Sequence, residues 1–142
     1  MAELALIATL TAITDAQGRV SDRVDNNTAN KRAIRFNVRI RSGGTGPDLG
    51  VGYLFYFHRQ DDETTSHQDD GVGESDADLS VQPSSSELVG SIILTADINT
   101  VYQTSFVVYD PGPFWSLSFW NDSGQTIHAT EGDHYLRYVY LD

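Results

Sequence analysis

One stretch decides the fold class of this 142-residue chain: Ala33-Ile-Arg-Phe-Asn-Val-Arg-Ile-Arg41. Apolar and polar residues alternate along it without a break. Because successive side chains of a β-strand point to opposite faces, this alternation predicts a half-buried strand. The apolar face is expected in the core, and the face that carries Arg35, Arg39 and Arg41 is expected to point outward.

Other segments give the same kind of signal. No segment of ten or more residues keeps the 3.6-residue apolar period of a helix. Short strands separated by Gly, Pro, Asn and Asp predict an all-β protein. About eight strands with two long connections favour a single antiparallel β-sandwich, best described as a jelly roll, with an immunoglobulin-like sandwich as the alternative. The further strands are expected at Leu4–Thr14, Val51–His58, Leu88–Thr95, Val101–Tyr109, Phe114–Trp120, Gln125–Thr130 and His134–Leu141, and a short piece at Leu79–Val81 is the candidate for one more.

Length and composition indicate one domain over residues 1–142, with a mass of 15.7 kDa. The run Leu4–Ile13 is apolar, but no Lys or Arg precedes it, so it is interpreted as a first strand and not as a signal peptide. No apolar run approaches the roughly 20 residues that span a bilayer. The chain has no cysteine, which excludes disulfides, thiolate metal sites and cysteine nucleophiles.

Charge is distributed unevenly along the chain. The net charge is −11; residues 1–41 contain seven basic and four acidic side chains, whereas residues 42–142 contain two basic and sixteen acidic ones. A strongly negative chain is unsuited to bulk binding of nucleic acid, which requires cations that neutralise phosphates. The scarcity of Lys and abundance of Asp fit either a saline environment or a merely acidic protein. The basic strip predicts a docking surface for an acidic partner, against the alternative of a solvated strand face. Its residues are Arg32, Arg35, Arg39 and Arg41.

A long acidic loop is expected at Asp61–Asp78. Carboxylates on a glycine-containing loop supply the oxygen ligands that calcium prefers, and the candidates are Asp69, Asp70, Asp76 and Asp78. Their spacing does not match the twelve-residue calcium loop, and a hydrated loop tip is the alternative. No other cofactor is expected. The chain has no G-x-S-x-G motif and no carboxylate on a strand among aromatics, so no enzymatic activity is expected.

The segment Phe114–Trp120 is the densest aromatic feature. On a strand, Trp115, Leu117 and Phe119 share one face, which is expected in the core. Phe114 and Trp120 share the other face with two serines. That face is interpreted either as a surface covered by a loop or a neighbouring subunit, or as a sugar-stacking platform that Tyr102 or Tyr138 extends.

The order of short motifs in the C-terminal part resembles a known group of proteins. The motifs are Val89-Gly-Ser-Ile-Ile-Leu-Thr95, Tyr102-Gln-Thr-Ser-Phe106, Pro113-Phe-Trp-Ser-Leu-Ser-Phe-Trp-Asn121, Ser123-Gly124 and a tyrosine-rich last strand. They resemble those of short structural proteins of tailed viruses and phages, over about Leu88–Leu141. The resemblance implies an all-β virion protein of the capsid surface or the tail, and it carries over no catalytic residue.

These observations together predict a capsid decoration (cement) protein that stabilises a viral shell through subunit contacts. The expected partners are further copies of the chain, in a trimer or another oligomer, and the major capsid protein or other virion subunits. Its expected location is the virion, after assembly in the host cytoplasm, with no membrane and no nucleic-acid partner. A carbohydrate-binding β-sandwich module, such as a host-recognition domain on a tail, is the alternative.

Overall fold

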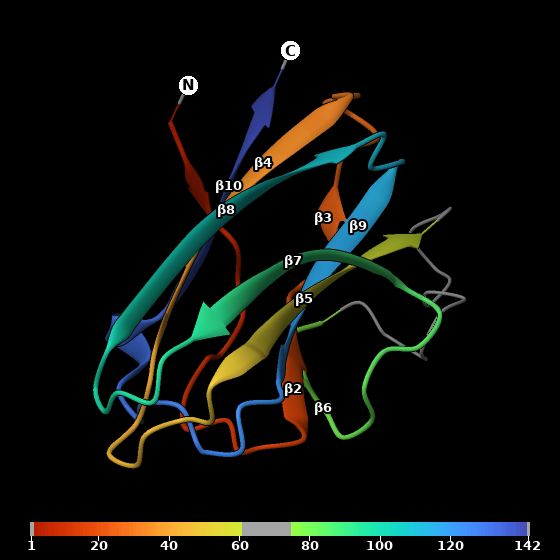
Figure 1. Ribbon diagram of the computed structural model, residues 1–142. Coiled ribbons are helices and arrows are strands. Elements are labelled where there is room, and N and C mark those ends of the chain that lie inside the picture. Colours follow the sequence, from red (N-terminus) through yellow and green to blue (C-terminus); the bar gives the residue numbers. More distant parts are fainter. Residues whose placement is uncertain (1, 61–74, 142) are drawn as a thin grey trace.

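A computed structural model of the chain describes residues 2–60 and 75–141. This part is all-β, as predicted, with one short 3₁₀ turn and no α-helix (Figure 1). None of its helical segments has the length and apolarity needed to cross a membrane. The elements are β1 (Leu4–Ala5), β2 (Gln17–Val20), β3 (Val24–Asp25), β4 (Ala33–Arg41), β5 (Gly50–Gln60), β6 (Ala77–Leu79), β7 (Glu87–Leu94), β8 (Val101–Tyr109), β9 (Phe114–Asn121), η1 (Glu131–Asp133) and β10 (Tyr135–Leu141).

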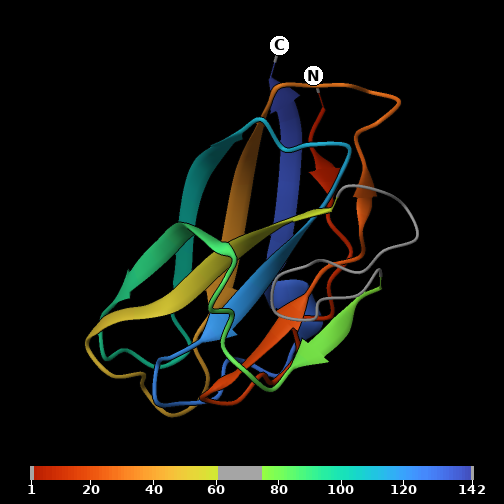
Figure 2. The same ribbon diagram turned by 90° about the vertical axis from the view of Figure 1, so that its right-hand side faces the viewer.

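The strands form two antiparallel sheets that face each other as the layers of a sandwich (Figure 2). The four-stranded sheet has the order β1-β10-β4-β8, and the six-stranded sheet has the order β6-β2-β9-β5-β7, with β3 also paired to β9. The chain crosses repeatedly from one sheet to the other. The predicted antiparallel sandwich is therefore confirmed. The crossing pattern is compatible with a jelly roll, and the jelly roll itself stays a prediction.

The core lies between the two sheets, where the sequence pattern placed it. Ile34, Phe36 and Ile40 of β4 have no exposed surface. Trp115 of β9 is also fully buried. Its ring meets Phe36 edge-on at 5.4 Å between centroids and stacks on Phe57 at 5.6 Å. Aromatic rings in such contacts stabilise a core beyond the area that they bury, by about 0.5–1.5 kcal/mol per pair.

Two of the expected strands are mostly irregular. In the segment Leu4–Thr14, only β1 pairs with another strand, yet Leu6, Leu10 and Ile13 are buried. These apolar residues pack in the core although they are not part of a paired β-strand. In the segment Gln125–Thr130, a single bridge joins Ile127 to Ser42. Apolar content thus predicted burial in both segments but not extended pairing.

Candidate functional site

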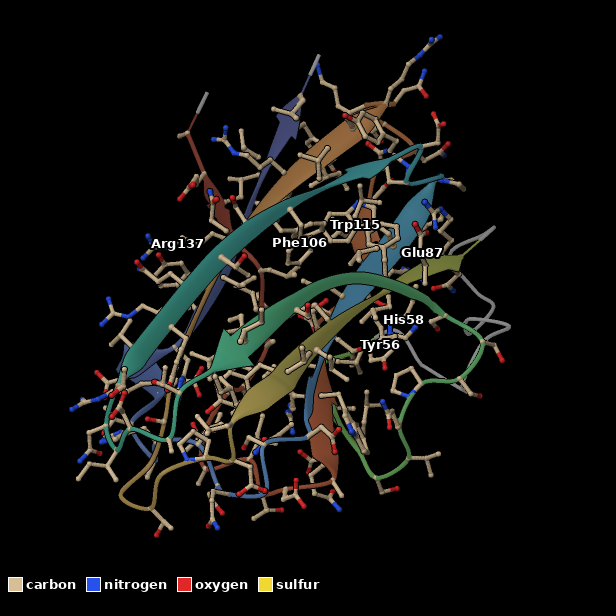
Figure 3. All side chains as sticks on the ribbon, viewed as in Figure 1. Tyr56, His58, Glu87, Phe106, Trp115 and Arg137 are labelled. Atoms are coloured by element: carbon tan, nitrogen blue, oxygen red, sulfur yellow. The ribbon has the colours of Figure 1, made fainter. Side chains whose placement is uncertain are left out.

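The outer face of the four-stranded sheet carries a row of arginines. Arg35, Arg39 and Arg41 alternate with the buried residues of β4 and point away from the core. Arg137 of β10 lies opposite Asn37 in the ladder and joins the same face (Figure 3). We call these four residues the arginine face. It comprises Arg35, Arg39, Arg41 and Arg137.

The arginine face is electrostatically one-sided. The four strands of this sheet contain four arginines and no acidic residue. Because the whole chain carries a net charge of −11, the other residues carry −15. This sheet therefore has an excess of positive charge, which the adjacent carboxylates of Glu3 and Asp133 reduce, and the excess orients the molecule toward an acidic surface during association.

The four arginines differ in how far they are already engaged. Arg41 already has an ion-pair partner in the chain, since its Nη1 lies 2.7 Å from the Asp133 carboxylate. The hydrogen bond from Arg41 lowers the pKa of Asp133 below its usual 3.8. The Arg137 guanidinium lies 4.0 Å above the Tyr135 ring, a cation–π contact that leaves its hydrogen-bond donors at the edge. Arg35 and Arg39 form no ion pair within residues 2–60 and 75–141. Arg39 also has a buried Nε with no hydrogen-bond partner there.

A shallow polar depression lies beside these two unpaired arginines. It is lined by Asn37 of β4, Gln103 and Ser105 of β8, Tyr135 of β10 and Glu3. The Glu3 carboxylate accepts a hydrogen bond from the Asn37 side chain, and the Tyr135 hydroxyl accepts one from Gln103. Arg35 and Arg39 beside this depression can each bind a partner's carboxylate through two parallel hydrogen bonds, whereas the Glu3 carboxylate in the lining opposes a second negative charge inside the depression.

The structure divides the predicted basic strip. It brings Arg35, Arg39 and Arg41 onto one face, but Arg32 precedes β4 and lies beside Asn30 and Asp110 at the end of the sheet. Sequence reasoning did not include Arg137. Its alternation with the buried Leu136 and Tyr138 could have indicated an outward direction, but only the register with β4 places it among the other arginines.

The second aromatic face of β9 is covered by the chain itself. Phe114 is 7% exposed and Trp120 is 4% exposed, while the two serines between them are fully buried. A covering loop was one of the two interpretations left open by the sequence. A sugar platform needs open rings, and neither ring is open. The idea that Tyr102 or Tyr138 extends this row is wrong, because both lie in the opposite sheet and face the core, in edge contacts with Tyr53 and Trp115.

A buried histidine, His58, anchors part of that cover, a role that the sequence did not predict. Ser118 Oγ lies 2.7 Å from Nε2 of His58, and Ser86 Oγ lies 2.7 Å from its Nδ1. His58 is fully buried on the outer side of the six-stranded sheet, next to Tyr56, whose hydroxyl accepts a hydrogen bond from Gln82 (Figure 3). These bonds attach the segment before β7 to the sheet. Only the register of β5 with β9, which places His58 opposite Ser116, brings this histidine next to the serines of β9.

Two of the calcium-ligand candidates, Asp76 and Asp78, lie in the described residues, and both form ion pairs with Arg19. Arg19 Nε lies 2.5 Å from Asp76 and Arg19 Nη1 lies 2.7 Å from Asp78. Asp69 and Asp70 lie outside the described residues. Within the described residues, no group of three or more His, Asp or Glu side chains is arranged to hold a metal ion. A calcium site therefore stays a prediction, and two of its four proposed ligands already share a guanidinium.

Comparisons with known proteins do not assign the chain to a family. No protein-family model matches it, and no curated protein matches it. The arguments for function therefore rest on the sandwich and its arginine face.

Proposed function

We propose that this chain is a structural docking protein, and specifically a capsid decoration protein of a tailed virus, whose arginine face contacts an acidic surface on the shell. The observation that carries the docking role is the one-sided charge, with +4 on one sheet of a chain of net −11. Arg35 and Arg39 have no ion pair with a described residue, so they can meet carboxylates of a partner without giving up one of their own.

Docking of this kind stabilises an assembled shell by mass action. A protein that binds the assembled state and not the separate subunits shifts the equilibrium toward assembly, by about 2.7 kcal/mol when its concentration is about 100 times its dissociation constant. Charged contacts at such an interface contribute orientation and association rate more than affinity. The net negative remainder of the chain disfavours attachment to an acidic shell in any other orientation.

The viral part of the proposal is supported by the resemblance of Leu88–Leu141 to tailed-virus structural proteins. In this chain the segment supplies β8, β9, β10 and nearly all of β7. The motif positions fall on structural roles: Gly90 allows close packing against Phe106, Trp115 fills the core, and Asn121 holds a turn. These roles suit a protein that works through shape and surface, without a catalytic centre.

The test uses empty capsids of the virus that encodes the chain, prepared without this protein. Binding is measured by co-sedimentation, and Arg35→Glu combined with Arg39→Glu is expected to weaken it at least tenfold and to reduce its dependence on salt. The matched comparison is Arg35→Glu against Arg32→Glu. Both side chains are exposed and lack an ion pair in the described residues, but only Arg35 lies on the arginine face. Equal binding by these two single variants, or full binding by the double variant, would rule the docking role out.

A further inference from the structure

Both sheets end in a long open strand on the same flank of the sandwich. At its other edge, each sheet is closed by a short strand, β1 with two residues and β6 with three. On the open flank the edge strands are β7 with eight residues and β8 with nine, and no described strand pairs with their outer sides. The two strands run side by side across the front of the molecule in Figure 1 and along one side in Figure 2.

Exposed apolar side chains lie on both strands of the open flank, and the core beside the flank is incompletely covered. Ile93 is 74% exposed on the outer face of the six-stranded sheet, and Tyr109 is 70% exposed on the outer face of the four-stranded sheet. Three residues that face the core, Val89, Tyr102 and Phe106, are only partly buried. The remaining exposed hydrophobic residues of β7, β8 and the turn between them are Leu88, Ile98, Val101 and Val107.

The longer edge strand is covered at one end, where Arg59 Nη2 donates to the Tyr109 carbonyl oxygen at 2.9 Å, but the rest of the strand lacks the usual protections against pairing. Soluble proteins normally interrupt an exposed edge with a charged residue, a proline or a bulge, because unpaired N–H and C=O groups accept another strand. β8 contains no charged residue and no proline, and its ladder with β4 runs through nine residue pairs without a register shift. Its outer edge therefore offers a regular template for a further strand.

We propose that this flank is a two-fold interface between two copies of the chain, in which β8 pairs antiparallel with the partner's β8. Ser105 is the middle residue of β8, so it lies opposite the partner's Ser105. Val101 then faces the partner's Tyr109, and Thr104 faces the partner's Phe106. Pairs of aromatic with β-branched residues are favourable across antiparallel strands, and this register places no like charges opposite each other.

The dimensions of the flank suit a second copy. A nine-residue strand is about 30 Å long, and two sheets about 10 Å apart with their side chains are about 20 Å thick. The contact would bury on the order of 600 Å² on each copy, or about 1,200 Å² in total, which is the lower limit for a specific interface. A two-fold axis perpendicular to the sheets also brings β7 next to the partner's β7, so both open edges are covered by one contact.

The charge pattern allows this contact as well. One arginine lies on the flank itself: Arg59 pairs with Glu87 of β7, and its Nη2 donates to the carbonyl oxygen of Tyr109 at the end of β8. The arginines of the arginine face lie one strand or more inside the edge, the nearest of them on β4. The two β4 strands would be separated by about three strand spacings, about 14 Å, which exceeds the Debye length of about 8 Å at physiological salt. Repulsion between the two copies then comes mainly from their net charge of −11 each, which salt screens. Added salt should therefore strengthen this dimer, whereas it should weaken docking through the arginine face.

Because the natural chain has no cysteine, a single introduced one reports the register directly. Opposed residues of an antiparallel pair have Cα atoms about 4.5–5.5 Å apart, which a disulfide can bridge. We expect Ser105→Cys to form a covalent dimer with diamide, which takes up the two electrons and two protons. The control is Val81→Cys, whose side chain is 76% exposed in the segment between β6 and β7, away from the flank. Equal cross-linking of the two variants would overturn the register.

The second measurement is light scattering on the full chain over a concentration series. The natural chain is expected to be dimeric at tens of micromolar, with a dissociation constant that falls as salt is raised. Ser105→Lys, which places two lysines opposite each other, is expected to raise that constant at least tenfold, while Val81→Lys leaves it unchanged. Circular dichroism checks that both variants are folded. A monomer at all concentrations, or an oligomer that Ser105→Lys does not affect, would refute the interface. Neither result depends on whether the arginine face binds a shell.

Discussion

Removal of the Asn121 side chain tests how the sandwich closes at the end of β9. Asn121 is the last residue of β9 and has no exposed surface. Its Nδ2 donates hydrogen bonds to the carbonyl oxygens of Ile13, at 2.9 Å, and Gln125, at 2.8 Å. Its Oδ1 accepts hydrogen bonds from the N–H and hydroxyl of Ser123. One amide thus joins the N-terminal segment, the end of β9 and the following turn.

The expected loss follows from these four bonds. A net contribution of about 1 kcal/mol for each bond gives about 4 kcal/mol. The two carbonyl groups are not left without a donor: Ile13 still accepts from the Ile127 N–H, and the single Ser123 hydroxyl proton, released from Asn121, can turn to Gln125. The buried Ser123 N–H loses its partner. Asn121→Ala should therefore cost about 3–4 kcal/mol of unfolding free energy, which for a domain of this length lowers the melting temperature by about 10 °C.

Urea unfolding measures this change, with fluorescence of the buried Trp115 and Trp120 as the signal. The matched control is Asn27→Ala, at an exposed asparagine, which should change the unfolding free energy by less than about 0.5 kcal/mol. The reasoning would be refuted if Asn121→Ala stayed within about 1 kcal/mol of the natural chain at an unchanged urea slope.

Two further predictions concern pH. Burial alone would raise the pKa of Asp76, but hydrogen bonds from Arg19 and Thr9 outweigh burial and lower this pKa below 3.8. The free energy of unfolding should therefore fall as the pH drops below about 3.8. Asp76→Asn should make this fall smaller, as measured by urea titrations at pH 5 and pH 3. Burial lowers the pKa of His134 below 6.5, and its Nδ1 accepts the Arg41 backbone N–H at 3.1 Å. As the pH decreases, the His134 imidazole of the unfolded chain is protonated before that of the folded chain, so the free energy of unfolding should fall from about pH 6.5 toward the folded pKa. His134→Gln should make the plot of unfolding free energy against pH flatter between pH 7.5 and pH 5. An unchanged pH profile in either variant would contradict the corresponding assignment.

The strands that alternation predicted are those that build the core. β4 and β9 show a two-residue period because each has one face against the opposite sheet, so the buried positions of Phe36 and Trp115 followed from sequence alone. β2 is a strand for a different reason. Its residues Gln-Gly-Arg-Val show no apolar alternation, and it is extended because it pairs with β9 and β6. The local sequence of β2 does not indicate that β9 and β6 lie beside it.

The candidate site was only partly predictable for the same reason. The outward direction of Arg35 and Arg39 is local, because it follows from their neighbours in β4. The neutralisation of Arg41 by Asp133 and the addition of Arg137 come from residues more than 90 positions away in the chain. Burial of Trp120 likewise depends on what covers the outer side of the six-stranded sheet, which strand parity cannot specify.

The two proposed surfaces reinforce each other geometrically. Pairing through β8 uses backbone groups that point within the plane of the four-stranded sheet, whereas the arginine face points perpendicular to that plane. A two-fold axis perpendicular to the sheet leaves both arginine faces on the same side of the dimer. The dimer would then dock through two arginine faces, and the second contact would form at the high effective concentration set by the first. Dimerisation should consequently strengthen shell binding, and added salt should act on the two steps with opposite sign.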